Sequence, residues 1–229
     1  MQPEDLSARL HLGLAAYALG ELEVCESALR QVVARRPDIA IAWKHIVAVR
    51  HRYGKLAIPA RTRLTELLPE DPDVWAQLGE AWMHKQAPLR AIACFRRALA
   101  IAPGDLASRC RLGLLLIDTG EIAAAERELH LVLAERPGSS SALTGLARIR
   151  SWRRDDSGAR ALIAPLITQT PPVDAAALWA ELSSVRPDEA LPVLVSALAQ
   201  CSAPAPRSLL LHRLGDVQDA LGETEAAFA

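Results

Sequence analysis

Apolar and polar residues alternate along this chain in a pattern that repeats about every 34 residues. Within residues 73–103, apolar positions recur at spacings of three and four on both sides of a break near residues 86–88. They are Trp75, Leu78 and Trp82, then Ala91, Ile92, Phe95, Ala98 and Leu99. Such spacing places the side chains on one stripe of a helix. The pattern therefore predicts two helices per unit, which cover each other's apolar stripes.

Prolines mark the same period. They lie 32, 34, 34 and 34 residues apart, at Pro37, Pro69, Pro103, Pro137 and Pro171. Because proline cannot continue a helix, each of them is expected to follow the end of the second helix of its unit. A period of this length is typical of stacked helical hairpins, in which a unit buries its apolar face only against a neighbour.

The unit that ends at Pro137 matches the preceding one position for position. The equivalent residues are Leu112, Gly113, Leu116, Gly120, Ala125, Leu129, Val132 and Pro137. Gly79 and Gly113 lie beside the apolar stripe, where a small residue permits the second helix to approach closely. Gly120 suits the turn between the helices, because glycine adopts left-handed backbone angles at little cost.

These units resemble the tetratricopeptide repeat family, whose first helix carries Trp, Leu-Gly and an aromatic residue and whose second carries Ala, an aromatic, Ala and Pro. The resemblance implies an all-α fold, a right-handed α-solenoid of antiparallel helix-turn-helix repeats. About six repeats and a partial seventh form one domain over residues 1–229. The predicted repeats are 1–37, 38–69, 70–103, 104–137, 138–171, 172–204 (degenerate) and 205–229 (partial).

Two repeats depart from the pattern. Repeat 2 is two residues shorter near Tyr53-Gly54-Lys55, which leaves the register of its second helix open, and we expect Pro59 in the first turn of that helix. In repeat 6, Pro187 and Pro192 crowd the turn between the two helices. We expect a shorter or kinked hairpin there.

The resemblance also indicates where a partner would bind, because the first helices of such repeats line a concave groove. The first-helix residues expected to project into it are Lys44, His51, Arg52, His84, Arg148 and Trp152. Most are basic, and the net charge is +4 for residues 38–103 and +3 for 138–171, against −5 for 172–229. We expect a non-catalytic protein-interaction scaffold whose groove attracts an acidic peptide or protein. The alternative is that these basic residues only solvate the surface.

No catalytic, cofactor or metal site is predicted. Four cysteines, Cys25, Cys94, Cys110 and Cys201, lack the paired spacing of a zinc site, and no histidine lies three or four residues from another histidine or cysteine on a shared helix face. A glycine-rich phosphate loop is absent. The apolar runs are shorter than the roughly 20 residues of a membrane span. Nucleic-acid binding is disfavoured by a pI of about 6.6 and an acidic C-terminal third.

Asparagine is absent from the chain. The resemblance then excludes two family functions, the clamp for a C-terminal carboxylate and the asparagine ladder of sugar-transferring relatives, because both are built with asparagine. A content of 23 Arg against 3 Lys favours a GC-rich bacterial source. The acidic N-terminus lacks the basic and apolar sections of a signal peptide, which favours a cytoplasmic protein.

The C-terminal segment gives two further expectations. Residues 212–229 resemble the last repeat before the catalytic domain of bacterial tetratricopeptide-linked sulfotransferases. This resemblance implies, as the alternative function, the N-terminal arm of a larger enzyme with its catalytic domain beyond residue 229. Because Ala226, Ala227 and Phe228 begin an apolar stripe that nothing covers, self-association through this end is the other expectation.

Overall fold

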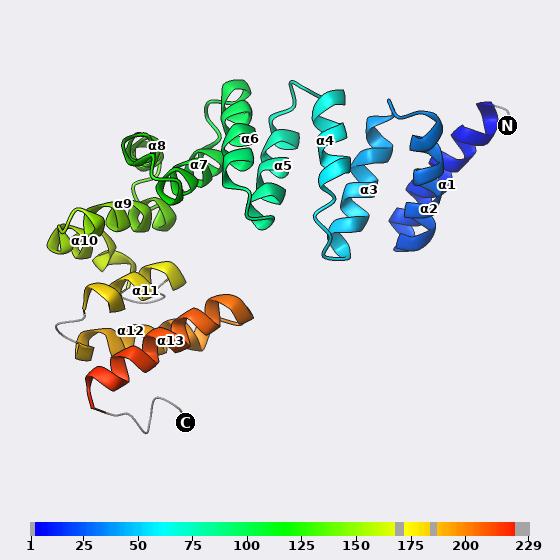
Figure 1. Ribbon diagram of the computed structural model, residues 1–229. Helices are drawn as coiled ribbons and strands as arrows, with labels where there is room; N and C mark the ends of the chain where they lie inside the picture. The colour runs from blue at the N-terminus through cyan, green and yellow to red at the C-terminus, as the bar shows by residue number, and fades with distance from the viewer. Residues whose placement is uncertain (1–2, 168–171, 184–186, 223–229) are drawn as a thin grey trace. The chain divides into compact units, whose positions relative to one another are not determined.

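The computed structural model of the chain describes residues 3–167, 172–183 and 187–222. These residues form thirteen α-helices and one short 3₁₀ helix, with no strand among them (Figure 1). Within each half of the chain, consecutive helices pack against each other as hairpins. The predicted all-α fold is confirmed.

The chain divides into two compact units, residues 1–115 and 116–229, whose boundary falls within one helix. The first unit contains six complete helices and the first part of a seventh. They are α1 (Pro3–Leu19), α2 (Leu22–Arg35), α3 (Ala40–Arg52), α4 (Ile58–Leu67), α5 (Pro72–His84), α6 (Pro88–Ile101) and α7 (Leu106–Asp118).

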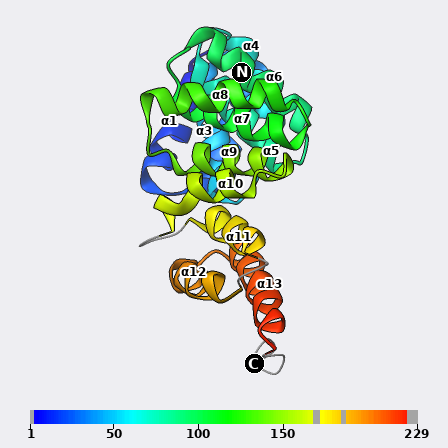
Figure 2. The ribbon, with the colours of Figure 1, turned by 90° about the vertical axis from the view of Figure 1, so that its left-hand side faces the viewer.

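The second unit begins within α7 and continues through six more α-helices and the 3₁₀ helix. They are α8 (Ile122–Glu135), α9 (Ser140–Trp152), α10 (Asp156–Ile163), η1 (Ala164–Leu166), α11 (Val173–Leu182), α12 (Pro187–Gln200) and α13 (Pro204–Ala220). The last three α-helices pack against one another around Leu194 and Leu210 (Figure 2). In repeat 6, α11 has 10 residues, against 13 in α9, and Pro192 lies inside α12.

Each of the first four repeat prolines lies two residues beyond the end of a second helix. The residue before the proline lies outside the helical region in every case, with φ between −124° and −134° and ψ between 62° and 83°, at Arg36, Leu68, Ala102 and Arg136. This conformation follows from the clash between a proline ring and a preceding residue in the helical region. The prolines therefore end the helices, as their spacing predicts.

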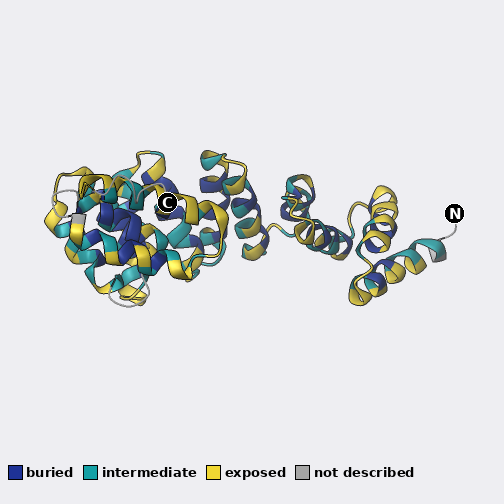
Figure 3. Ribbon diagram, turned by 90° about the horizontal axis from the view of Figure 1, so that it is seen from below, coloured by how far each residue is buried: buried dark blue, intermediate teal, exposed yellow. Residues whose placement is uncertain are grey.

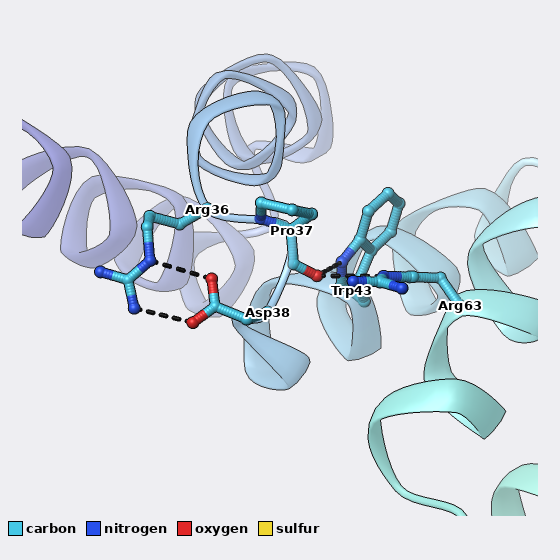
Figure 4. Close-up of polar contacts among 5 residues, drawn as sticks. All are labelled: Arg36, Pro37, Asp38, Trp43 and Arg63. Carbon is cyan, nitrogen blue, oxygen red and sulfur yellow. Dashed lines mark hydrogen bonds and ion pairs between the residues drawn. The ribbon is translucent and has the colours of Figure 1, made fainter.

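The carbonyl groups of three of these prolines, Pro37, Pro69 and Pro103, accept hydrogen bonds from side chains of the next repeat. Figure 4 shows the Trp43 indole N–H donating to the Pro37 carbonyl at 2.9 Å, with Arg63 Nε donating to the same oxygen at 3.2 Å. Trp75 bonds the Pro69 carbonyl in the same way, also at 2.9 Å. Trp43 and Trp75 thus tie the starts of α3 and α5 to the ends of the repeats before them, and Arg109 makes the equivalent bond from α7 to the Pro103 carbonyl at 2.6 Å.

The core of most repeats is centred on a large apolar residue eight positions before the repeat proline. Leu29, Phe95, Leu129 and Ile163 occupy this position and are fully buried. Leu29 and Phe95 pack on the first helix at a glycine, where an added Cβ would lie 2.5 Å from Leu29 at Gly13 and 3.0 Å from Phe95 at Gly79. Buried residues accordingly gather where helices face each other (Figure 3).

The turn between first and second helices uses one left-handed residue at a constant position. Its φ is 80° at Gly20, 67° at Gly54 and 83° at Gly120. Gln86 and Arg154 take the same conformation without being glycine, at 56° and 63°. Among the turns that the structure describes, those of two repeats therefore carry backbone strain.

Repeat 2 is the irregular member of the first unit. Its second helix, α4, has 10 residues, whereas α2 and α6 have 14. The end of α4 lies two residues before Pro69, as in repeats 1, 3 and 4, so the residues that α4 lacks are those of its first turn. Ala57, the N-cap residue of α4, has a left-handed φ of 51°. Pro59 lies in the first turn of α4, as predicted.

Candidate functional site

A groove runs between α3, α4 and α5 in the first unit. It consists of two adjoining cavities of about 310 and 250 Å³, which share His51, Arg61 and Gln77. The larger cavity is also lined by Lys44, Val47, Ala48, Leu64, Asp71 and Val74, and the smaller by Gly54, Lys55, Leu56, Glu80, Ala81 and His84. We call this surface the α3–α5 groove.

The irregularity of repeat 2 accounts for the groove. Arg61 lies eight residues before Pro69, the position of the buried apolar residue in the neighbouring repeats, and Val47 replaces the glycine that faces that residue. Without the first turn of α4 and without a large apolar side chain, the space between the two helices is not filled from within. The position that closes the core of repeat 3 therefore lines a cavity in repeat 2.

Hydrogen bonds hold the Arg61 guanidinium beside α5 and the loop between α3 and α4. Nε donates to the Leu56 carbonyl at 3.0 Å, and Nη1 donates to the carbonyl and side-chain oxygens of Gln77, both at 3.2 Å. Burial lowers the pKa of Arg61, and the nearby Glu80 carboxylate partly opposes this shift. Glu80 itself pairs with Arg111 at 3.0 Å.

Three of the six residues predicted from sequence line the α3–α5 groove, namely Lys44, His51 and His84. Lys44 is partly neutralised, because its Nζ lies 3.4 Å from Asp71 Oδ2. Arg52 belongs to neither cavity. Its guanidinium lies over the Tyr17 ring of α1, with Cζ 5.1 Å from the ring centroid.

Arg148 and Trp152 lie in the second unit. Arg148 pairs with Asp118 at 2.9 Å, and its guanidinium carbon lies 5.8 Å from the Trp152 ring centroid. Trp152 is 55% exposed. The six predicted residues therefore do not form one site. Three line the α3–α5 groove, Arg52 lies over Tyr17 of α1, and Arg148 and Trp152 lie together in the second unit.

Arg61 is a groove residue that the sequence reasoning missed. Its signal is the count of eight residues to Pro69, because the same count from the neighbouring prolines reaches only large apolar residues. The open register of repeat 2 concealed this count.

A further cavity, of about 630 Å³, lies on the outer face of α1 and α2. It includes Leu12, which is 53% exposed, whereas the equivalent Ile46, Leu78, Leu112 and Leu146 are at most 5% exposed. In the inner repeats this position is covered by the preceding repeat. This cavity is thus an uncovered stacking face, and nothing in the described residues shows what covers it.

The described residues hold no candidate for a metal site or a membrane-spanning helix. No three or more His, Cys, Asp and Glu side chains cluster as metal ligands would in residues 3–167, 172–183 and 187–222. Among the helices of those ranges, none combines the length and apolarity of a membrane span. Ala226, Ala227 and Phe228, on which the self-association expectation rests, lie outside the described residues.

Sequence comparison identifies the repeats. Residues 46–105 and 83–149 each match a family model described as tetratricopeptide repeat. No curated protein matches the chain.

Solved structures show the same fold over nearly the whole chain. A tetratricopeptide repeat protein from Parabacteroides merdae is 17% identical, with 98% of this chain and 90% of that chain covered and a TM-score of 0.79. MamA is 16% identical, with 81% and 97% covered and a TM-score of 0.63. YrrB, described as a TPR protein with an unusual peptide-binding site, is 16% identical, with 84% and 89% covered and a TM-score of 0.62. The segment 46–149 thus matches the tetratricopeptide repeat models, and the chain has the fold of these solved structures.

Proposed function

We propose that this chain is a non-catalytic protein-interaction scaffold that binds an extended segment of a partner protein in the α3–α5 groove. The observation that carries the proposal is the pair of adjoining cavities between successive first helices, which three of the sequence-predicted residues line. A groove with an apolar floor and a few convergent polar groups is the usual form of a binding site.

The lining of the groove suits a peptide. Its larger cavity has buried apolar residues at Val47, Leu64 and Val74, which would cover apolar side chains of the partner. Because these residues belong to packed helices, the groove is formed before binding and little ordering entropy is lost when a partner arrives. The likeness to YrrB, whose structure is described as having a peptide-binding site, supports the proposal at the level of the fold.

The charge of the groove favours an acidic partner. Lys44, Lys55 and Arg61 contribute three positive charges, against the carboxylates of Asp71 and Glu80. Residues 38–103 as a whole carry a net charge of +4. Such a surface accelerates the association of an acidic segment, and the acceleration falls as salt screens the charges.

The alternative function, the arm of a sulfotransferase-type enzyme, rests on residues 212–229. Residues 212–220 lie in α13, but 223–229 are outside the described residues. No observation on the described residues favours this alternative, and it stays a prediction from sequence.

Peptide selection tests the proposed function. A random peptide display library would be selected against the intact chain and, in parallel, against Ala48→Trp, which places a large ring in the larger cavity. Ala34→Trp, at an exposed position of α2 outside both cavities, is the matched control. We expect the wild-type chain and Ala34→Trp to enrich the same peptides and Ala48→Trp to lose them, with circular dichroism confirming that all three are folded. Equal enrichment by both variants would exclude the α3–α5 groove.

A further inference from the structure

Arg61 occupies a position that is otherwise reserved for the centre of a repeat core. The equivalent residues Leu29, Phe95, Leu129 and Ile163 each have no exposed surface. A charged side chain costs free energy at such a place unless an opposite charge or a full set of hydrogen bonds compensates it. Among these repeats, only repeat 2 has a charged residue at this position, and that residue, Arg61, lines both cavities of the α3–α5 groove.

The compensation that the chain itself provides is incomplete. The acceptors of Arg61 are the Leu56 carbonyl and the two oxygens of Gln77, all of them neutral. These bonds use Nε and Nη1, so the Nη2 amino group has no acceptor within the described residues. The lowered pKa of Arg61 has the same origin, since its first cause is burial.

The neighbouring carboxylates are engaged elsewhere. Glu80, which lines the smaller cavity, pairs with Arg111 at 3.0 Å, and Asp71, which lines the larger one, pairs with Lys44 and also accepts from the Asp73 backbone N–H. No carboxylate of the described residues forms an ion pair with Arg61. The α3–α5 groove therefore holds the partly buried guanidinium of Arg61, and no carboxylate of the described residues is paired with it.

We infer that Arg61 anchors the carboxylate of an Asp or Glu side chain in the partner segment that occupies the α3–α5 groove. The inference rests on the proposed function and names the chemical feature that the groove selects. A planar guanidinium with free N–H donors matches a carboxylate, and such charge-assisted hydrogen bonds are among the stronger ones in proteins. Lys44 and the apolar floor would contact the rest of the segment.

Arg61→Leu separates this role from a purely structural one. Leucine restores the residue type of the equivalent positions, so this variant is expected to fold, while it removes every donor that a carboxylate could use. Arg63→Leu is the matched control, because Arg63 lies on the same helix, pairs with Glu66 and belongs to neither cavity.

The first experiment uses acetate as the smallest carboxylate. Arginine Nε–Hε resonances of the ¹⁵N-labelled chain would be followed by NMR as sodium acetate replaces sodium chloride at constant ionic strength, with Arg61 assigned from its absence in Arg61→Leu. We expect the Arg61 resonance to shift more than that of any other arginine, and to do so equally in Arg63→Leu. A shift no larger than that of the exposed arginines would overturn the inference and leave the proposed function standing.

The second experiment uses the peptides that the library selection enriches. Each acidic residue would be replaced by its amide, Glu by Gln or Asp by Asn, and the affinities measured for the wild-type chain, Arg61→Leu and Arg63→Leu. For one acidic position we expect the amide to bind the wild type and Arg63→Leu roughly tenfold or more weakly, as for a lost hydrogen bond to a charged group. Arg61→Leu should bind acid and amide equally. If Arg61→Leu still distinguishes acid from amide at every position, the inference is overturned although the groove binds peptides. If no peptide is enriched, the proposed function fails, and this inference fails with it.

Discussion

Repeats 2 and 3 are adjacent and have the same helical hairpin architecture, but the space between their two helices is filled in one and open in the other. In repeat 3, the Phe95 ring is fully buried and packs on Gly79, where an added Cβ would lie 3.0 Å from the ring. In repeat 2, Val47 and Arg61 take these two positions and the second helix has lost its first turn. One helix pair is closed and the other lines a groove. The difference shows that a binding cavity can arise within a repeat by shortening one helix and exchanging one core residue.

The neighbouring repeats explain why repeat 2 tolerates the exchange. Each hairpin is stabilised by the hairpins on either side as well as by its own core. The α3 helix keeps Ala42, Ile46 and Val49 almost fully buried against its surroundings. A weak centre is therefore compatible with a folded array, provided that the stacking faces remain apolar.

The largest expected effect comes from opening the closed repeat. Phe95→Ala removes a buried ring, and we expect it to lower the free energy of unfolding by about 3–5 kcal/mol because of the cavity that remains. Urea denaturation followed by circular dichroism measures the loss. Arg61→Leu, at the matched position, should change the free energy by no more than about 1 kcal/mol, because lost hydrogen bonds are offset by the removal of a partly buried charge. Equal losses would show that the two repeats are packed alike.

A second test concerns the start of the first helices. In repeat 3, Asp71 caps α5 by accepting from the Asp73 backbone N–H at 3.1 Å, whereas α3 begins after Ile39 without a side-chain cap. Asp71→Ala should lower the free energy of unfolding by about 1 kcal/mol. Asp73→Ala, which removes an acidic side chain from the same turn but leaves the cap, should cost less. Should both variants lose the same amount, the interaction with the helix dipole outweighs the hydrogen bond.

In the turns between their helices, repeat 3 rather than repeat 2 has the less favourable residue. Repeat 2 has glycine at the left-handed position, Gly54, and repeat 3 has Gln86 with a φ of 56°. We expect Gln86→Gly to raise the free energy of unfolding by about 0.5–1 kcal/mol, because it relieves a conformation that side chains disfavour. Gly54→Ala should lower it by a similar amount. Both changes can be measured as shifts of the urea midpoint, and a loss of stability in Gln86→Gly would contradict the interpretation.

The smallest effect is expected at the entry to repeat 2. The hydrogen bond from Arg36 lowers the pKa of Asp38 to about 2, and the two side chains lie 2.7–2.9 Å apart (Figure 4). A depressed pKa contributes stability above the unfolded value of about 4, and this contribution is lost as the pH falls towards 2. Because both groups are exposed, we expect only a slight loss of stability. NMR titration of the Asp38 carboxyl measures the pKa directly, and Arg36→Gln should return it towards 4.

The sequence predicts the helical hairpins well because proline acts locally. Pro37, Pro69, Pro103 and Pro137 each exclude the helical region for the residue before them, so each second helix ends two residues earlier whatever surrounds it. Periodicity then locates the buried face, as at Leu29 and Phe95. Both signals are independent of distant contacts.

The candidate site was predicted only in part, because it depends on contacts between repeats. Lys44 and Arg148 were recognised as first-helix cations, but their partners Asp71 and Asp118 lie 27 and 30 residues away. Separations of about one repeat carry no local signal. Arg61 was missed because the two-residue deletion gave two possible registers for α4, and the choice depends on which end of the helix is fixed. The structure shows that the Pro69 end is fixed.

The shortened α4 has a mechanical consequence. In a linear array, force applied to the two ends passes through every hairpin in series, and the hairpin with the fewest internal contacts yields first. A helix of 10 residues beside neighbours of 14 makes repeat 2 the expected point of rupture in the first unit. A partner that fills the α3–α5 groove would strengthen that point. Binding of a partner would then raise the force at which the first unit begins to unfold and extend.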